Sequence, residues 1–280
     1  MRTVLLLMAW MVSAIPGQAG ELSLVAQLER AANGEHRADD QIDRNRHRHP
    51  IATLEFFGLE DGMSVLEIWP GSGWYTEILA PVLRDKGLFA VASWDPAVEG
   101  QPDYRYRLPL EMQAKFEANP SIYDKVEVIH YSPPATESLG QGRFNMILTF
   151  RNTHGWLRNG AAQGIYNDMA EALMPGGILG VVQHRADGDE VMTDHAGGYV
   201  TEATVISLAE KAGLEFVARS ELNANPKDTK DHPEGVWTLP PSLRLDDVDR
   251  EKYLAIGESD RMTLRFRKPG GLAALQMELD

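Results

Sequence analysis

The clearest indication of the fold is the segment 65–74, which reads Val65-Leu66-Glu67-Ile68-Trp69-Pro70-Gly71-Ser72-Gly73-Trp74. An apolar run that carries an acid near its end is followed by a Gly-x-Gly turn and then by a helical pattern. Glycine lets the backbone approach a ligand closely, and the start of the helix presents unpaired N–H groups. The pattern predicts a strand–turn–helix unit that could hold a nucleotide-like ligand, with Glu67 accepting hydrogen bonds from a ribose or an amino group. Because Gly-x-Gly also occurs in plain turns, other segments must decide between these interpretations.

Short apolar runs alternate with helical patterns along the rest of the chain. Candidate strands span 64–69, 88–93, 126–131, 146–150, 178–184, 214–218 and 262–266. Candidate helices span 21–32, 74–84, 110–118, 161–173 and 202–212. This alternation predicts an α/β fold with parallel pairing through crossovers and helices on both faces of the sheet. We expect one domain over 51–280, an N-terminal helix and polar arm over 20–50, and a loop excursion over 240–252.

The composition excludes several classes of protein. The 280 residues include 27 Lys and Arg against 41 Asp and Glu, for a net charge of −14. A nonspecific nucleic-acid binder instead needs a basic surface that displaces counterions from phosphates. The absence of cysteine excludes disulfides, thiolate metal sites and a cysteine nucleophile. No apolar run reaches the ~20 residues of a membrane-spanning helix. We therefore expect neither a nucleic-acid partner nor a membrane span.

The first nineteen residues have the layout of a secretory signal peptide. Arg2 gives a positive start, residues 4–12 are uninterruptedly apolar, and Pro16 and Gly17 end the run. Gly17 and Ala19 supply the small residues that precede a cleavage site. We therefore expect residues 1–19 to be a signal peptide and the protein to be exported, to the periplasm.

Further segments carry a resemblance to a known family. The segments 67–73, 144–147 and 174–177 together resemble class I S-adenosylmethionine-dependent methyltransferases. More narrowly, the segments 48–50, 69–75, 223–229 and 255–261 resemble a group of exported bacterial proteins that are predicted methyltransferases. The resemblance covers about residues 47–270. It implies a Rossmann-like, doubly wound sheet of seven strands in the order 3-2-1-4-5-7-6, with strand 7 antiparallel. It also implies S-adenosylmethionine as the cofactor, bound by Glu67, Trp69, Gly71, Ser72, Gly73 and Asp95.

Three positions depart from the methyltransferase pattern. Trp69 replaces the first glycine of the motif acid-x-Gly-x-Gly-x-Gly, and its indole would crowd the methionine part of the cofactor or reshape the pocket. The acid expected at the end of the second strand is missing at 92–93 and comes only at Asp95, so its register for binding a ribose changes. Where many relatives carry an acid for the adenine amine, residues 131–134 read Tyr-Ser-Pro-Pro.

The segment 150–156, Phe-Arg-Asn-Thr-His-Gly-Trp, follows the predicted fourth strand. Ligands of open α/β sheets bind beyond the carboxyl ends of the strands. His154 could act as a general base, since imidazole titrates near neutral pH. The planar fork of Arg151 suits a carboxylate or a phosphate. We take Arg151, Asn152 and His154 as candidate catalytic residues; the alternative is that they only stabilise a turn.

The remaining charged clusters carry weaker predictions. The histidines at 47, 49, 154, 184 and 195 have no spacing typical of zinc ligands, so we expect no metal site. The basic cluster 44–49 could attract an anionic ligand, or be a solvated arm. Glu258 and Asp260 beside Arg261 are explained by an exposed local ion pair.

Three hypotheses about function follow. The first is methyl transfer from S-adenosylmethionine to a small acceptor, with His154 and Arg151 aligning or deprotonating it. The second is an exported small-molecule-binding protein that keeps the methyltransferase fold without methyl transfer and binds an apolar or anionic molecule. The third is a hydrolase or lyase that uses His154 and His184, although no Gly-x-Ser-x-Gly motif is present. The sequence identifies neither the acceptor nor the oligomeric state.

Overall fold

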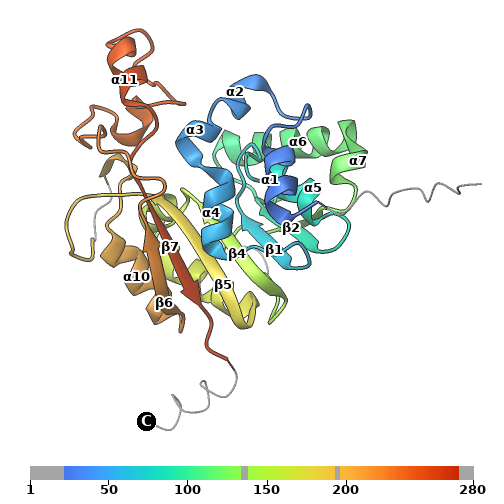
Figure 1. Cartoon of the computed structure of the whole chain (residues 1–280). Coiled ribbons are helices and arrows are strands. Elements are labelled where there is room, and N and C mark those ends of the chain that lie inside the picture. Colours follow the sequence, from blue (N-terminus) through green and yellow to red (C-terminus); the bar gives the residue numbers. More distant parts are fainter. Residues whose placement is uncertain (1–21, 134–137, 193–195, 271–280) are drawn as a thin grey trace, which may run out of the picture.

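A mixed sheet of seven strands forms the centre of the protein (Figure 1). The structure is a computed structural model that describes residues 22–133, 138–192 and 196–270. The strand order is β3-β2-β1-β4-β5-β7-β6, and β7 is antiparallel to both of its neighbours. The strands are β1 Ser64–Ile68, β2 Leu88–Ser93, β3 Glu127–His130, β4 Phe144–Phe150, β5 Leu173–His184, β6 Glu215–Ser220 and β7 Arg261–Arg267. This confirms the predicted fold, including the strand order and the antiparallel β7.

The register of the parallel strands brings their carboxyl ends to one edge. Ile68 of β1 lies opposite Ala92 of β2 and Thr149 of β4, and Ala92 lies opposite Ile129 of β3. The residues that follow these strands therefore meet at the same edge of the sheet, which we call the carboxyl edge. Ligands of open α/β sheets bind there.

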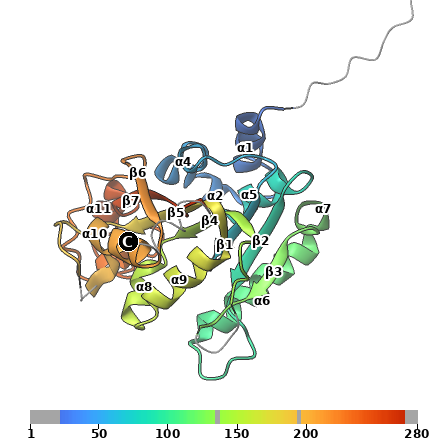
Figure 2. The ribbon, with the colours of Figure 1, turned by 90° about the horizontal axis from the view of Figure 1, so that it is seen from below.

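Helices cover both faces of the sheet, as predicted. Side chains alternate along β1, so Leu66 packs with one face and Val65 with the other. Figure 2 shows α1 and α4 on one side of the strands and α8 and α9 on the other. The helices are α1 Leu24–Ala32, α2 Asp39–Ile42, α3 Asn45–Arg48, α4 Pro50–Phe57, α5 Thr76–Leu83, α6 Asp103–Ala118, α7 Pro120–Tyr123, α8 Thr153–Arg158, α9 Ala162–Ala172, α10 Glu202–Lys211 and α11 Arg250–Ile256, with 3-10 turns η1 Ala196–Gly198 and η2 Gly235–Thr238.

Several local expectations need correction. The expected loop excursion over 240–252 ends in a helix, because α11 begins at Arg250. The segment 174–177 lies within β5 as an irregularity, since Leu173 and Ile178 both pair with β4. The polar segment 33–50 contains the short helices α2 and α3, and its backbone packs against the domain. The Trp74 indole donates to the Gln41 carbonyl oxygen at 3.0 Å.

Some predictions fall outside the described ranges. The expected signal peptide, residues 1–19, and His195 both lie there. None of the helices in the described ranges combines the length and the apolar character that a bilayer crossing needs.

Candidate functional site

Trp69 directly follows β1, at a backbone position that favours glycine. Its φ is 44°, in the left-handed region, where a residue with a Cβ costs about 1–2 kcal/mol. Its N–H donates to the Ala92 carbonyl oxygen at 2.8 Å, so the pairing of β1 with β2 continues through it. A tryptophan persists in such a conformation where its surroundings hold it there.

The indole of Trp69 fills the space across the ends of β1, β2 and β3. Its Nε1 donates to the Tyr131 carbonyl oxygen at 3.0 Å, directly after β3. Its ring lies 5.2 Å from that of Trp94 and 5.7 Å from that of Trp156, between ring centroids. The Arg105 guanidinium covers it at 5.2 Å. Because the side chain is only 8% exposed, the indole is part of the core, and it reshapes this part of the site.

Glu67 is buried beneath the turn and faces α5. The Thr76 hydroxyl donates to its carboxylate at 2.6 Å. Burial raises the pKa of Glu67 to about 7, and the hydrogen bond from Thr76 opposes this shift. The side chain therefore links β1 to the first turn of α5.

The predicted Gly-x-Gly turn is present. Gly71 and Gly73 have φ values of 64° and 83°. A Cβ on Gly73 would lie 3.3 Å from the Cβ of Thr76. Both its positive φ and this close contact therefore favour glycine at position 73. Ser72 between them is exposed, and its carbonyl oxygen accepts a hydrogen bond from Lys115 Nζ at 2.8 Å.

Asp95 stabilises the loop that follows β2. Its carboxylate accepts the Ala97 N–H at 2.8 Å, and its own N–H donates to the Ser132 hydroxyl at 2.8 Å. Its Oδ1 also lies 3.6 Å from Nδ1 of His130. These contacts connect the ends of β2 and β3 directly to each other.

A cavity of about 240 Å³ opens at the carboxyl edge. We call it the edge cavity. It is lined by Trp69, Pro70, Gly71, Trp94, Phe150, Arg151, Asn152, His154, His184, Val236, Trp237, Pro240, Pro241, Ser242, Glu258 and Ser259. Of the predicted site residues, the structure thus brings together Trp69, Gly71, Arg151, Asn152 and His154. Glu67, Ser72, Gly73 and Asp95 do not line this cavity.

Arg151 presents a cationic group to the edge cavity. Its φ of 64° places it, like Trp69, in the left-handed region. Burial lowers the pKa of Arg151 to about 10, Glu258 opposes this shift, and Arg261 adds to it, so the guanidinium stays charged at neutral pH. Among the described residues, no acceptor lies within hydrogen-bonding distance of this guanidinium. A strained residue that offers an unmatched charge to a cavity indicates a ligand site.

Glu258 is the counter-ion of a buried arginine cluster. Its carboxylate accepts from Arg44 Nε at 2.7 Å, Arg48 Nε at 3.0 Å and Arg261 Nη1 at 3.0 Å. Burial alone would raise the pKa of Glu258, but Arg48, Arg261, Arg44 and Arg151 lower it well below its ordinary value. Three guanidinium groups thus share one carboxylate, and Arg151 acts on it only through its nearby charge. The expectation of an exposed local pair at Glu258 is wrong, because Arg48 and Arg261 are 3% and Glu258 is 4% exposed.

This cluster also corrects the interpretation of the basic segment 44–49. Figure 1 shows α3 and the segment that carries α11 beyond the same end of the sheet. Arg44 and Arg48 reach across to Glu258 there, so they are not a solvated arm. The buried Nη2 atoms of both arginines have no hydrogen-bond partner among the described residues. The local charge is therefore strongly positive within an acidic protein.

Asn152 and His154 have different roles in the wall of the edge cavity. The Asn152 amide donates to the Ile68 carbonyl oxygen at 2.8 Å and to the Thr149 hydroxyl at 3.1 Å, which fixes the ends of β1 and β4 relative to each other. His154 Nδ1 accepts from the Gln183 amide at 3.3 Å. Its ring lies 5.5 Å from that of His184. The two histidines named in the hydrolase-or-lyase hypothesis thus lie near each other.

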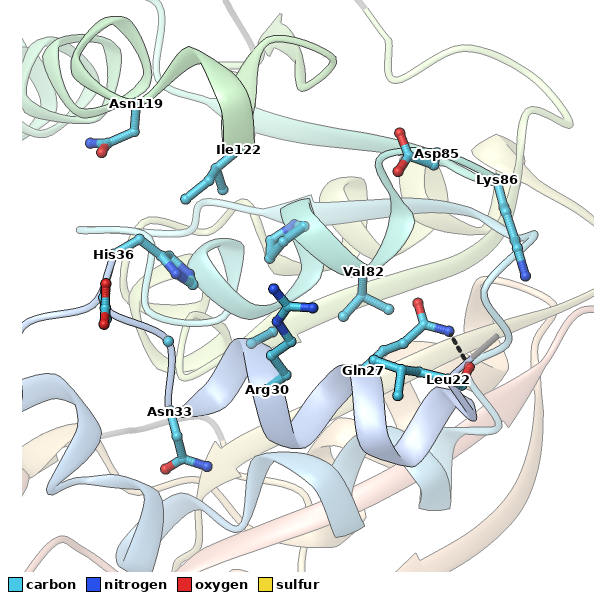
Figure 3. A pocket seen from close by; sticks show the side chains of 14 residues that line it. Leu22, Gln27, Arg30, Asn33, His36, Val82, Asp85, Lys86, Asn119 and Ile122 are labelled. Carbon is cyan, nitrogen blue, oxygen red and sulfur yellow. Dashed lines mark hydrogen bonds between the residues drawn. The ribbon is translucent and has the colours of Figure 1, made fainter. Parts of the chain in front are cut away.

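A larger cavity, of about 1080 Å³, lies away from the carboxyl edge (Figure 3). It is formed between α1, α5 and α7, close to the residues that precede β2. Figure 3 shows Gln27 and Arg30 of α1 facing Val82 of α5 and Ile122 of α7 across it. Leu22, where the described chain begins, also lines this cavity. Its wall contains none of the predicted site residues.

Solved structures share this fold at low sequence identity. One is a SAM-dependent methyltransferase from Aquifex aeolicus: TM-score 0.50, 16% identity, covering 70% of this chain and 92% of the other. Another is the N-methyltransferase NodS from Bradyrhizobium japonicum in complex with S-adenosyl-l-homocysteine: TM-score 0.51, 18% identity, covering 88% and 98%. The chain has a methyltransferase fold. The [4+2]-cyclase SpnF matches equally well, with TM-score 0.51, 16% identity and coverage of 89% and 93%. No protein-family model and no curated protein matches the chain.

The site can be tested against S-adenosylmethionine, the cofactor that the sequence resemblance implies. That resemblance places the ribose at the end of β2 and the adenine after β3. The Trp69 indole occupies this space and donates to the Tyr131 carbonyl oxygen, while the Asp95 carboxylate accepts the Ala97 N–H and the Asp95 N–H donates to the Ser132 hydroxyl. In this structure the residues therefore do not fit the adenosine part. The edge cavity, beside Gly71 and Arg151, is open to a smaller molecule.

Sequence reasoning missed part of the site. Glu258 was expected only in an exposed ion pair, and no site role was predicted for Ser259 or Trp237, yet all three line the edge cavity. The motif Gly-Glu-Ser-Asp-Arg at 257–261 contained a signal, because four of its members are polar and directly precede a strand. Within the described ranges, no group of three or more His, Asp or Glu residues is placed to hold a metal ion.

Proposed function

We propose that this chain binds a small anionic molecule in the edge cavity, with Arg151 as the group that holds it. The single observation that carries this proposal is the Arg151 guanidinium, which faces the cavity with no acceptor among the described residues. A carboxylate or phosphate can accept two parallel N–H bonds from such a fork. The volume of about 240 Å³ suits a molecule well below the size of a nucleotide cofactor.

The surrounding charges support an anion over a neutral ligand. Arg44, Arg48 and Arg261 already share Glu258, so they do not compete for the anion as free cations, yet they keep the local potential positive. A buried positive potential strengthens the attraction of an anion because the site is shielded from water. This positively charged arginine cluster contrasts with the net charge of the whole chain, which is −14. His154 and His184 supply further polar contacts.

Titration calorimetry with succinate and with phosphate tests this proposal. Arg151→Gln should weaken the binding about tenfold to hundredfold, since a hydrogen bond to a charged group contributes about 1.5–3 kcal/mol. Arg107→Gln is the matched control, because Arg107 is an exposed arginine paired with Glu111 on α6. Binding that is equal in the wild type and in Arg151→Gln would contradict the assignment, as would no binding of either anion.

Methyl transfer from S-adenosylmethionine to this anion is the second candidate function. It is favoured by the shared fold, since NodS, which matches over 88% of this chain, was solved with S-adenosyl-l-homocysteine. The Trp69 indole argues against it in this conformation. Calorimetry with S-adenosylmethionine separates the two candidates. Heat of binding at micromolar cofactor would support methyl transfer. No heat at millimolar cofactor would rule out methyl transfer, and anion binding would be the remaining candidate.

Export of the protein is a further part of the proposal. It is supported by the signal-like sequence of residues 1–19. S-adenosylmethionine is made in the cytoplasm, so an exported chain would meet little of it. Cell fractionation followed by N-terminal sequencing tests this point, and a mature chain that begins at Gly20 is the expected result. A full-length chain in the cytoplasmic fraction would contradict it.

A further inference from the structure

Ser259 and His184 meet at the wall of the edge cavity. The Ser259 Oγ lies 2.5 Å from His184 Nδ1. His184 is the last residue of β5, and Ser259 comes two residues before β7. The antiparallel pairing of His184 with Arg261 holds the two segments together. The Arg185 N–H also donates to the Asp260 carbonyl oxygen at 3.0 Å, so a second backbone contact holds the Ser259 loop against the end of β5.

The His184 imidazole is in the state that a base requires. Its side chain is buried, and burial, followed by the nearby His154, Arg151 and Arg261, lowers the pKa of His184 well below its ordinary value, although Glu258 opposes this shift. The ring is therefore neutral at neutral pH. With its proton on Nε2, Nδ1 accepts the Ser259 hydroxyl proton, which is the arrangement of a serine nucleophile and its base.

The same cavity supplies a group that can position a substrate. Arg151 lies in the wall with Ser259 and His184, so an anion held by Arg151 shares the cavity with the Ser259 oxygen. Trp237 also lines this cavity and provides an apolar surface. A small molecule that carries a carboxylate at one end and an ester at the other matches this arrangement.

We propose that Ser259 and His184 form a nucleophile–base pair that hydrolyses small carboxylic esters bearing an anionic group. This inference rests on the proposed anion site at Arg151. It requires neither a metal ion nor a cofactor. It differs from the Gly-x-Ser-x-Gly arrangement, because Ser259 comes from the loop between α11 and β7.

The reaction has two balanced steps. The Ser259 oxygen attacks the carbonyl carbon while His184 Nδ1 takes the hydroxyl proton, and the C–O bond to the alcohol breaks as His184 returns that proton to the leaving oxygen. This step leaves an acyl-Ser259 ester. In the second step His184 takes a proton from water, the hydroxide attacks the acyl carbon, and the proton goes to Ser259 as the acid departs.

Two chromogenic esters of similar length test the proposal. The probes are 4-nitrophenyl hydrogen succinate, which carries a carboxylate, and 4-nitrophenyl butyrate, which does not. The wild type should release 4-nitrophenolate from the succinyl ester with a kcat/KM at least about tenfold above that for the butyryl ester. Arg151→Gln should remove this preference mainly by raising KM for the succinyl ester.

The decisive readout is which residue of the wild-type protein becomes acylated. Peptide mass spectrometry after a brief reaction should find one succinyl group on Ser259. Ser259→Ala and His184→Gln should each lower the rate about a hundredfold or more, whereas Ser138→Ala, a change at an exposed serine, should not. The kcat/KM of the wild type for the succinyl ester should fall with decreasing pH only well below pH 6.5. His184→Gln should abolish this pH dependence.

Either of two results would overturn the proposal. One is an equal rate in the wild type and in Ser259→Ala, which would show reaction at surface groups. The other is acylation elsewhere than at Ser259. Succinate calorimetry keeps the two proposals apart. If succinate binds and Ser259 is not acylated, the esterase proposal fails while the anion site stands; if succinate does not bind, the anion site itself fails.

Discussion

Replacing Trp69 by glycine separates the packing role of the indole from the ligand chemistry of the site. The indole is 8% exposed, and truncation of a buried large aromatic side chain costs about 3–5 kcal/mol. The lost bond from Nε1 leaves the Tyr131 carbonyl without its donor, which adds about 1 kcal/mol. Because glycine adopts a φ of 44° without strain, the substitution also stabilises the folded state by about 1 kcal/mol. Trp69→Gly should therefore lower the free energy of unfolding by about 3–5 kcal/mol.

The same substitution should change what the protein binds. It empties the space between the ends of β1 and β3, where the resemblance to methyltransferases places the adenosine. Urea denaturation measures the stability, and calorimetry with S-adenosylmethionine measures the binding. We expect no heat from the wild type and a measurable heat from Trp69→Gly. Trp69→Phe is the control, since it keeps a ring in place and loses only the indole N–H.

Two outcomes would contradict the packing of the Trp69 indole or its exclusion of the cofactor. A loss of stability below about 1 kcal/mol would mean that the indole is not packed as the structure has it. Micromolar binding of S-adenosylmethionine by the wild type would mean that the indole does not exclude the cofactor.

Three further predictions concern buried charge and backbone. The pKa of Glu67 rises from 4.5 to about 7 on folding, so between these pH values the folded state holds a proton that the unfolded state has lost, and the free energy of unfolding falls as pH rises. Glu67→Gln should remove up to about 3 kcal/mol of this fall, measured by urea denaturation at pH 4 and pH 8. The same dependence of stability on pH in both proteins would contradict this prediction. Glu258→Gln should cost about 3–5 kcal/mol, because Arg44, Arg48 and Arg261 lose their counter-ion. Since the folded pKa of Glu258 is depressed, its contribution is present above pH 4.5 and is lost at lower pH, so the difference between the two proteins should shrink in acid; a constant difference would argue against the cluster. Gly235→Ala should lower the thermal midpoint strongly, since its Cβ would lie 2.2 Å from Gly197 backbone atoms, and an unchanged midpoint would contradict that contact.

The fold was predictable because its signals are local and repeated. All seven candidate strands are present, because each is an apolar run bounded by turn residues. The helix α10, capped by Thr201 and followed by Gly213, begins as predicted at Glu202 and ends within one residue of its predicted end. The segments that were missed lack such periodicity. The helix α11 is charged on several sides, and α8 contains Gly155, so neither shows a clear apolar face.

The site was predictable only in part. Arg151 and His154 were found because they follow a strand whose end lies at the carboxyl edge. The burial of Glu258 could not be read from its neighbours, since Arg44 and Arg48 are more than two hundred positions away in the chain. The direction taken by the Trp69 side chain was equally hidden. The sequence shows that tryptophan replaces the first glycine of the motif at position 69, but only the contact with Tyr131 shows where the indole lies.

A crystal structure of the protein grown with succinate would show whether an anion binds at Arg151. We expect one carboxylate of succinate within hydrogen-bonding distance of the Arg151 guanidinium, with the Trp69 indole still bound to the Tyr131 carbonyl. Succinate bound away from Arg151, or an indole turned out of its place, would contradict it.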